Sequence, residues 1–281
     1  MFASNPIAAL TSVVPLEIIQ GYVILMVVLV VGGTLLDMLI KKNAAYFFAK
    51  AKAAEASRTK ILSPADKINA AVSTLAVEVA TSADFCNIKR RLSHLLTMYG
   101  FLIFLFATLA LVFAYPIDEA PVIASQLWHL GAAMVTFGGF WFWFFIRVDV
   151  SAEGMPWNRI VQADLFVLSL LGTTTFGLIW SFSYSLGATT FAMLPLALFI
   201  ASATILFSTV YWSKFAHMFF KPAAALNRRI TVADGSRENL PEIGDLSDPE
   251  IQKLYPDIPE YLGTNPPNMG LGIGRDKSRH Y

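Results

Sequence analysis

Cysteine is almost absent from this chain, and charged residues are scarce. Cys86 is the one cysteine among 281 residues, so the chain forms no internal disulfide and has no Cys-x-x-Cys pair for zinc or an iron–sulfur cluster. Only 15% of the residues are charged, whereas 56% are hydrophobic and the mean hydropathy is +0.56. This composition is typical of an integral membrane protein. The formal net charge of +1 gives no indication of a nucleic-acid partner.

The first 20 residues contain no lysine or arginine. A cleavable signal peptide has a basic segment before a short apolar run, so we expect none here. Apolar runs long enough to cross a hydrocarbon core of about 30 Å follow along the chain. They cover about residues 21–40, 95–115, 127–146, 165–182 and 191–212. The sequence therefore predicts an all-α membrane protein, a five-transmembrane-helix bundle with a helical loop at 41–91 and an extended C-terminal tail at 221–281.

The distribution of lysine and arginine predicts the orientation. Of the 21 such residues, 10 lie in residues 41–91, two are Arg147 and Arg159, and nine lie from Lys214 onward. The N-terminal segment and the second and fourth connections between spans contain none. We expect a protein of the bacterial inner membrane, and lysine and arginine concentrate on the cytoplasmic side of such proteins. Its N-terminus at 1–20 would be periplasmic, and its loop and C-terminal tail cytoplasmic.

The loop and the tail differ in pattern. Ser63-Pro64-Ala65-Asp66 predicts a helix start, with serine as the N-cap and proline in the first turn. Apolar residues then recur at helical spacing, so this segment either lies on the membrane surface or packs under the bundle. The tail is polar and rich in proline, and is either a disordered segment or an arm that becomes ordered on a partner.

Histidines are the candidate ligands for a redox cofactor. The chain has four: His94, His129, His217 and His280. The topology places His94 and His217 near the inner surface, whereas His129 begins a span at the outer surface. A helix rises about 1.5 Å per residue, so His129 is too far from His94 for both to bind one metal ion.

One imidazole from each of two helices is a common way to hold a b-type haem. His94 and His217 would be the axial ligands to the iron, Arg91 and Lys214 would lie near the propionates or a quinone, and Gly100 would give room for the flat macrocycle. In the alternative interpretation, both histidines are interfacial residues and the cations only follow the charge rule.

Several motifs resemble one superfamily of membrane cytochromes b. They are Arg90-Arg91-Leu92-Ser93-His94-Leu95-Leu96 with Tyr99-Gly100-Phe101, then Ala163-Asp164-Leu165-Phe166, and then Ser213-Lys214-Phe215-Ala216-His217-Met218. The superfamily includes the gamma subunit of nitrate reductase and the membrane subunits of heterodisulfide reductase and of the quinone-interacting oxidoreductase complex. The resemblance covers about residues 20–225. The stretch 139–154 is most similar to the membrane anchor of adenylylsulfate (APS) reductase in sulfur oxidisers.

The resemblance implies haem b, with quinone as a diffusible substrate and a soluble cytoplasmic iron–sulfur flavoprotein, adenylylsulfate reductase, as the partner. Members with two haems have two histidines on the second span and two on the fifth. Here Phe104 and Phe199 stand where the outer pair is expected, which favours one haem over two. His129 is then a quinone contact, a ligand of a second haem together with Met193, or a buried hydrogen-bonded histidine.

Charged residues also flank the third and fourth spans. Arg147 and Asp149 end one, and Asp164 opens the other. They form either a salt-bridge layer or part of a proton or quinone path. The leading functional hypothesis is a non-catalytic electron-transfer subunit that passes electrons between the flavoenzyme and the quinone pool. The alternatives are a haem-free anchor for a soluble oxidoreductase and, ranked last, a small transporter, for which no internal repeat is evident.

Overall fold

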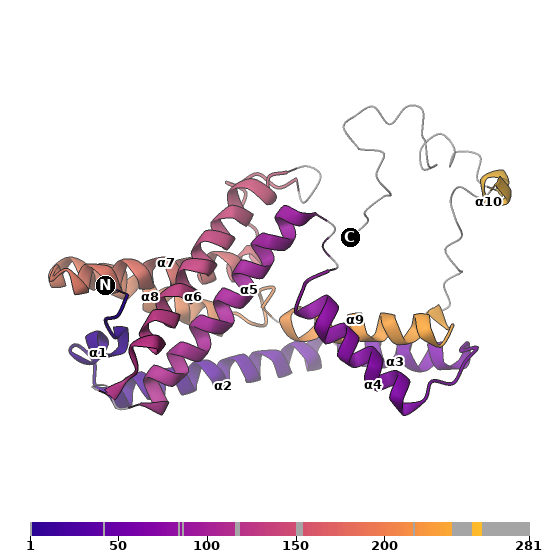
Figure 1. The fold of residues 1–281 in the computed structure, drawn as a ribbon, viewed down its shortest axis with the longest axis horizontal. Coiled ribbons are helices and arrows are strands. Elements are labelled where there is room, and N and C mark those ends of the chain that lie inside the picture. The colour runs from indigo at the N-terminus through magenta and orange to yellow at the C-terminus, as the bar shows by residue number, and fades with distance from the viewer. Residues whose placement is uncertain are drawn as a thin grey trace. The chain divides into compact units, whose positions relative to one another are not determined.

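The computed structural model describes residues 2–41, 43–83, 85, 87–115, 119–149, 154–215, 217–237 and 249–254 (Figure 1). Within these residues the chain is helical and contains no strand. Five helical segments are long and apolar enough to cross a membrane: Leu16–Ile40, Ile88–Ala114, Val122–Ile146, Gln162–Ser185 and Thr189–Ser208. The predicted fold class, an all-α bundle of five membrane spans, is confirmed.

The spans are built from helices with short irregular turns. Their elements are α2 (Leu16–Lys41), α5 (Ile88–Leu109) with η2 (Ala110–Ala114), α6 (Val122–Trp141) with η4 (Phe142–Ile146), η5 (Gln162–Asp164) with α7 (Leu165–Ser185), and α8 (Thr189–Ser208). Both η2 and η4 are single π-helical turns. The last span ends at Ser208 rather than at the predicted 212, because the backbone from Thr209 turns back and its carbonyl accepts bonds from Trp212 and Ser213.

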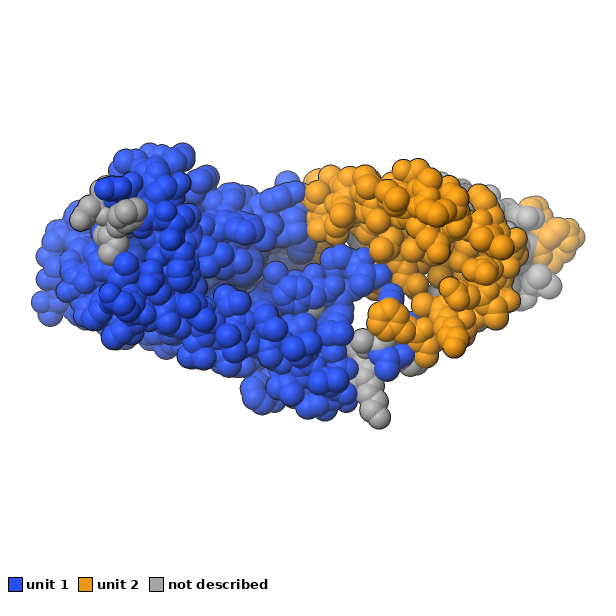
Figure 2. Space-filling model, turned by 90° about the horizontal axis from the view of Figure 1, so that it is seen from below, with its two compact units in different colours: residues 1–47, 89–223 blue, residues 48–88, 224–281 orange. Residues whose placement is uncertain are grey.

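The chain divides into two compact units, which are coloured separately in Figure 2. Unit 1 comprises residues 1–47 and 89–223 and contains the membrane spans. Unit 2 comprises residues 48–88 and 224–281, of which the structure describes the parts given above. Both His94 and His217 lie within unit 1.

Contacts between spans give their directions. Ser93 of α5 donates to the carbonyl of Gly138 in α6 (Oγ–O 2.8 Å), so the start of one helix lies beside the end of the next. Gln20 of α2 donates to Val112 at the end of the α5 span (Nε2–O 3.0 Å). These contacts match the alternating topology that the charge distribution predicts. We call the span ends beside Lys89, Arg147 and Lys214 the basic end.

Two buried clusters fill the bundle. The cluster nearer the basic end includes Phe101, Val135, Leu206, Val210 and Phe215. The other lies toward the opposite end and includes Trp128, Trp180 and Leu196. The short helix α1 (Pro6–Thr11) adds Ile7 and Leu10 to this second cluster, so the segment before the first span is part of the packed core.

Unit 2 contains α4 (Pro64–Ser73), η1 (Thr74–Val79), most of α3 (Asn43–Ala56) and the later part of α9 (His217–Ala233). Ser63 and Asp66 form a reciprocal capping box, which confirms the predicted helix start. Arg229 of α9 pairs with Glu78 (NH2–Oε1 2.7 Å), and the Asp234 carbonyl accepts from the Thr59 amide.

Helix α9 differs from the expected tail. The sequence predicts an extended segment from residue 221, but helical structure continues through Ala233. Three consecutive alanines at 223–225 favour a helix, and the Arg229–Glu78 pair holds it against η1. The rest of the predicted tail lies outside the described residues, apart from α10 (Pro249–Leu254).

Candidate functional site

His94 lies on the second turn of α5 and is half-buried. Its neighbour Ser93 is almost fully buried and donates to Gly138 of α6, so the backbone that carries His94 is fixed against the next span. Thr97 in turn donates to the Ser93 carbonyl (Oγ1–O 2.9 Å). These bonds position the His94 backbone at the basic end.

His217 is the first residue of α9, just after the turn that ends the last span. The buried ring of Phe215 anchors this turn, with its centroid 5.4 Å from Phe166 of α7 and 6.0 Å from Phe207 of α8. The Phe166 and His217 rings are nearly perpendicular, with their centroids 5.7 Å apart. The imidazole Nδ1 of His217 is hydrogen-bonded to the Lys214 carbonyl.

That hydrogen bond selects a tautomer. A carbonyl oxygen only accepts, so a neutral His217 carries its proton on Nδ1 and leaves the lone pair of Nε2 for another partner. His217 as a whole is exposed, but the protein on one side of the ring desolvates it and lowers its pKa, and the charges of Lys221 and Lys214 lower the pKa further against the opposing effect of the hydrogen bond. The ring is therefore neutral near pH 7, as a metal ligand must be.

The structure brings the two predicted ligands within electrostatic range of each other. Lys221, His217 and Arg90 all contribute to the electrostatic potential at the His94 ring. The charge of Lys221 also lowers the pKa of His217, so the same cation lies near both histidines. It lies four residues after His217, one helical turn along α9, which is the spacing by which the sequence could have indicated it.

The other predicted residues of the site have different surroundings. Lys214 is exposed and supplies the carbonyl that holds His217, while Arg91 is half-buried on α5. Gly100 is buried against α6: a Cβ there would lie 2.8 Å from the backbone nitrogen of Val135 and 2.9 Å from the Gly131 carbonyl. The space at Gly100 is occupied by the neighbouring helix, and its absent side chain serves helix packing.

His129 is fully buried at the end of α6 opposite the basic end. Both of its ring nitrogens have protein partners: Nδ1 lies 2.7 Å from the Ser125 carbonyl and Nε2 lies 2.8 Å from Ser181 Oγ. Its ring stacks on Phe182 with centroids 5.6 Å apart. Of the three alternatives for His129, these contacts agree with that of a buried, hydrogen-bonded histidine.

Phe104 and Phe199, the positions expected for a second pair of ligands, belong to a packed aromatic cluster. Phe104 lies 5.0 Å from Trp128, and Phe199 stacks on Trp180 at 5.9 Å, measured between ring centroids. Both indoles are only 1% exposed. Side chains therefore fill this part of the bundle.

The charged residues at the basic end form a buried node. Arg147 is 1% exposed and donates to Asp164 (NH2–Oδ2 2.6 Å) and to the carbonyls of Pro156 and Arg159 at 2.6 and 2.7 Å. Its guanidinium also lies 4.2 Å from the Trp143 ring centroid. Of the two alternatives, these contacts describe a salt bridge that closes the loop between α6 and α7.

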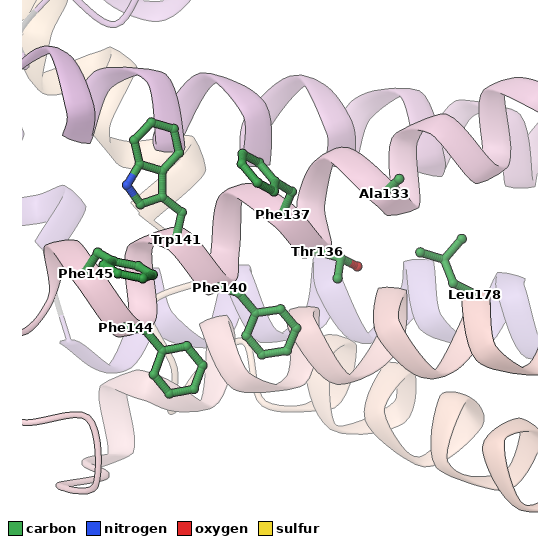
Figure 3. Close-up of a pocket in the computed structure, with 8 residues that line it drawn as sticks. All are labelled: Ala133, Thr136, Phe137, Phe140, Trp141, Phe144, Phe145 and Leu178. Atoms are coloured by element: carbon green, nitrogen blue, oxygen red, sulfur yellow. The ribbon is translucent and has the colours of Figure 1, made fainter.

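A separate open groove of about 650 Å³ runs along α6 and η4 (Figure 3). It is lined by Ala133, Thr136, Phe137, Phe140, Trp141, Phe144, Phe145 and Leu178. The aromatic side chains project from α6 and η4, and Leu178 comes from α7. Thr136 contributes the one hydroxyl, so the groove offers an apolar surface with no ionisable group.

Among the residues that the structure describes, no group of three or more His, Cys, Asp or Glu side chains is arranged to bind a metal ion. A haem iron requires only two protein ligands, so the histidine pair is the candidate centre. Comparisons with protein-family models, with curated proteins and with solved structures give no match to this chain.

Proposed function

We propose that this chain is the membrane-anchor, electron-transfer subunit of a quinone-linked oxidoreductase, with His94 and His217 as the two axial ligands of one haem b. One observation carries the proposal: the second span and the segment after the fifth bring these two histidines into electrostatic range of each other at the same end of the bundle. The chain itself is a redox subunit and performs no chemistry on a soluble substrate.

The residues fit a haem at this place in three respects. The Nδ1 bond to the Lys214 carbonyl leaves Nε2 of His217 with a lone pair, which is the arrangement that second-shell bonds give to metal-binding histidines. The lowered pKa of His217 keeps that ring neutral. Lys221 and Arg90 supply positive charge near His94, where two haem carboxylates would need it.

When bound, haem b supplies reversible one-electron storage on its iron. The chain's contribution is to hold two neutral imidazoles, to balance the carboxylates with cations, and to keep the pair at a span boundary. The aromatic cluster of Phe104, Trp128, Trp180 and Phe199 supports one haem rather than two, because it fills the interior where a second pair of ligands was expected.

The proposal places the protein in the bacterial cytoplasmic membrane, with the basic end on the cytoplasmic side. A soluble iron–sulfur flavoprotein similar to adenylylsulfate reductase would dock there and exchange electrons with quinone through the haem. The split of lysine and arginine between alternate connections supports the orientation. Alkaline phosphatase fused after residue 237 should be inactive, and active enzyme there would reverse the topology.

A haem-free anchor is the second candidate. The observation that favours it is the close packing at Gly100, where α6 occupies the space that the sequence interpretation assigns to the macrocycle. The chain would then only tether the flavoprotein at the membrane, and the histidine pair would be interfacial.

A reduced-minus-oxidised spectrum of the purified chain, with haem counted per polypeptide, distinguishes the two. We expect a six-coordinate b-type spectrum with one haem. His94→Ala and His217→Ala should each abolish it, whereas His280→Ala, at the fourth histidine, should not. Purified protein without haem after expression with excess haem precursor would support the haem-free anchor, and a normal spectrum from His217→Ala would refute the ligand pair.

A further inference from the structure

The α4 and η1 elements of unit 2 expose an apolar surface that no described residue covers. Ile68, Val72 and Leu75 are 63%, 58% and 58% exposed, and Ile61 just before the helix is 77% exposed. We call these four side chains the apolar stripe. Their spacing of four and three residues puts Ile68, Val72 and Leu75 on one side of the helix.

The opposite side of the same helix makes the contacts within unit 2. Ala70 and Thr74 are 8% and 2% exposed, and Glu78 pairs with Arg229 of α9. The helix therefore buries its small and polar residues and presents its large apolar ones. This is the reverse of an ordinary surface helix, whose apolar side faces the core.

We propose that the apolar stripe lies in the interface of a lipid bilayer that contains anionic lipids, with Lys60 and Lys67 at the headgroups. This docking is independent of the haem.

Chain connectivity supports a bilayer as the occupant. Residues 80–87 separate the end of η1 from the first residue of the second span, Ile88. Eight residues extend at most about 29 Å, since a chain spans at most about 3.6 Å per residue. The connection therefore limits how far the end of η1 can lie from the start of the second span, and an exposed apolar helix side near a bilayer is buried there at little additional entropic cost.

Charge supports an anionic surface. Residues 41–91 contain 10 lysines and arginines and four acidic residues, and Lys60 and Lys67 are exposed next to Ile61 and Ile68. The acidic side chains of α4 and η1 already have partners: Asp66 accepts from Ser63, and Glu78 pairs with Arg229. Basic side chains beside an inserted apolar side are typical of helices that bind anionic membranes.

The test uses the full-length chain in vesicles, with Cys86→Ser as the background. Single cysteines at Ile68, Val72 and Leu75 carry a small fluorophore, and Arg58→Cys, at an exposed polar position before α4, is the control. Quenching by lipids with brominated acyl chains reports direct lipid contact, and quenching by iodide reports water. We expect strong brominated-lipid quenching at 68, 72 and 75, and strong iodide quenching at 58.

Three results would overturn the proposal. Iodide quenching at the stripe positions equal to that at 58 would mean that the stripe faces water. Absence of both kinds of quenching would mean that protein covers it, either a partner or another part of this chain. Equal brominated-lipid quenching in phosphatidylcholine vesicles and in vesicles containing phosphatidylglycerol would exclude the anionic surface.

The charge is tested separately. Lys60→Gln with Lys67→Gln should reduce brominated-lipid quenching at position 72 in phosphatidylglycerol-containing vesicles, and added salt should do the same to the unaltered chain. Lys52→Gln, which removes an exposed lysine of α3 rather than one beside α4 in the sequence, is the control and should leave the quenching unchanged. If Lys52→Gln reduced the quenching as much as the double variant does, Lys60 and Lys67 would have no special role.

Discussion

The guanidinium of Arg147 and the carboxylate of Asp164 meet at 2.6 Å at the ends of two adjacent spans. They form the first of three polar contacts between the third and fourth spans, at the ends of those spans. Thr136 and Thr174 form the middle contact (Oγ1–Oγ1 3.0 Å), and His129 and Ser181 form the last (Nε2–Oγ 2.8 Å). His129, Thr136 and Arg147 are separated by two to three helical turns, so these contacts fix the register of the two antiparallel spans over their whole length.

Removing the Arg147 guanidinium should destabilise the bundle strongly. Arg147→Met leaves the Asp164 carboxylate without its cation and two carbonyls without a donor, and loss of one partner of a buried pair costs about 3–5 kcal/mol. Thermal unfolding in detergent measures the effect. Arg159→Gln is the control: its side chain is exposed and its carbonyl, which accepts from Arg147, is kept. Equal melting of both variants would show that the node is dispensable.

Gly131 should not tolerate a side chain. A Cβ at this position would lie 2.5 Å from the backbone nitrogen of Phe104 and 2.7 Å from the Gly100 carbonyl, so Gly131→Ala must push α5 and α6 apart. We expect a loss of about 1–3 kcal/mol, typical of overpacking, read as lower thermal stability.

Gly21→Ala is the matched control for that substitution. The same methyl group on α2 would meet nothing within 4 Å, and replacing a helical glycine by alanine stabilises by up to about 1 kcal/mol. A destabilised Gly21→Ala variant, or an unaffected Gly131→Ala variant, would contradict the helix contacts described here.

His129 and Ser181 should be coupled in stability and unconnected to haem content. His129→Phe leaves a buried hydroxyl without its ring partner and should cost about 1–3 kcal/mol. In a double-mutant cycle with Ser181→Ala, we expect the two losses to be less than additive. His129→Ala should keep its haem, because His129 lies at the opposite end of the bundle from His94. Loss of half of two haems in that variant would instead assign it as a ligand.

Acidification should weaken the fold partly through His217. The pKa of this ring is lowered in the folded chain, first by desolvation, so the unfolded chain takes up the proton at a higher pH, near the ordinary histidine value of about 6.5. Stability is therefore lost as the pH falls from about 6.5 through the lower folded pKa. Thermal melts of the haem-free chain between pH 7.5 and 5 should show a shallower acid-side decline for His217→Gln than for His280→Gln. Parallel curves would refute the effect.

The sequence by itself determined the five spans, their alternation and the helix start at Ser63. Long apolar runs indicate spans locally, because lipid requires every backbone polar group to be satisfied within its own helix. The alternation follows from counting lysine and arginine in each connection. The capping box depends only on residues 63–66, so it too was predictable. The positions of His94 and His217 on one side of the membrane follow from the same alternation.

Only the tertiary structure decided what each polar group contacts. The partners of His129 are a carbonyl on its own helix and Ser181, 52 residues away, and no local pattern indicates the second. The sequence suggested that Gly100 leaves room for a haem, but the backbone of α6 lies against it. Helices without large side chains at a crossing approach closely and gain packing contacts. The periodicity of α4 left open whether its apolar side packs under the bundle or lies on the membrane surface, and which side of the helix packs within unit 2 depends on contacts such as that between Glu78 and Arg229.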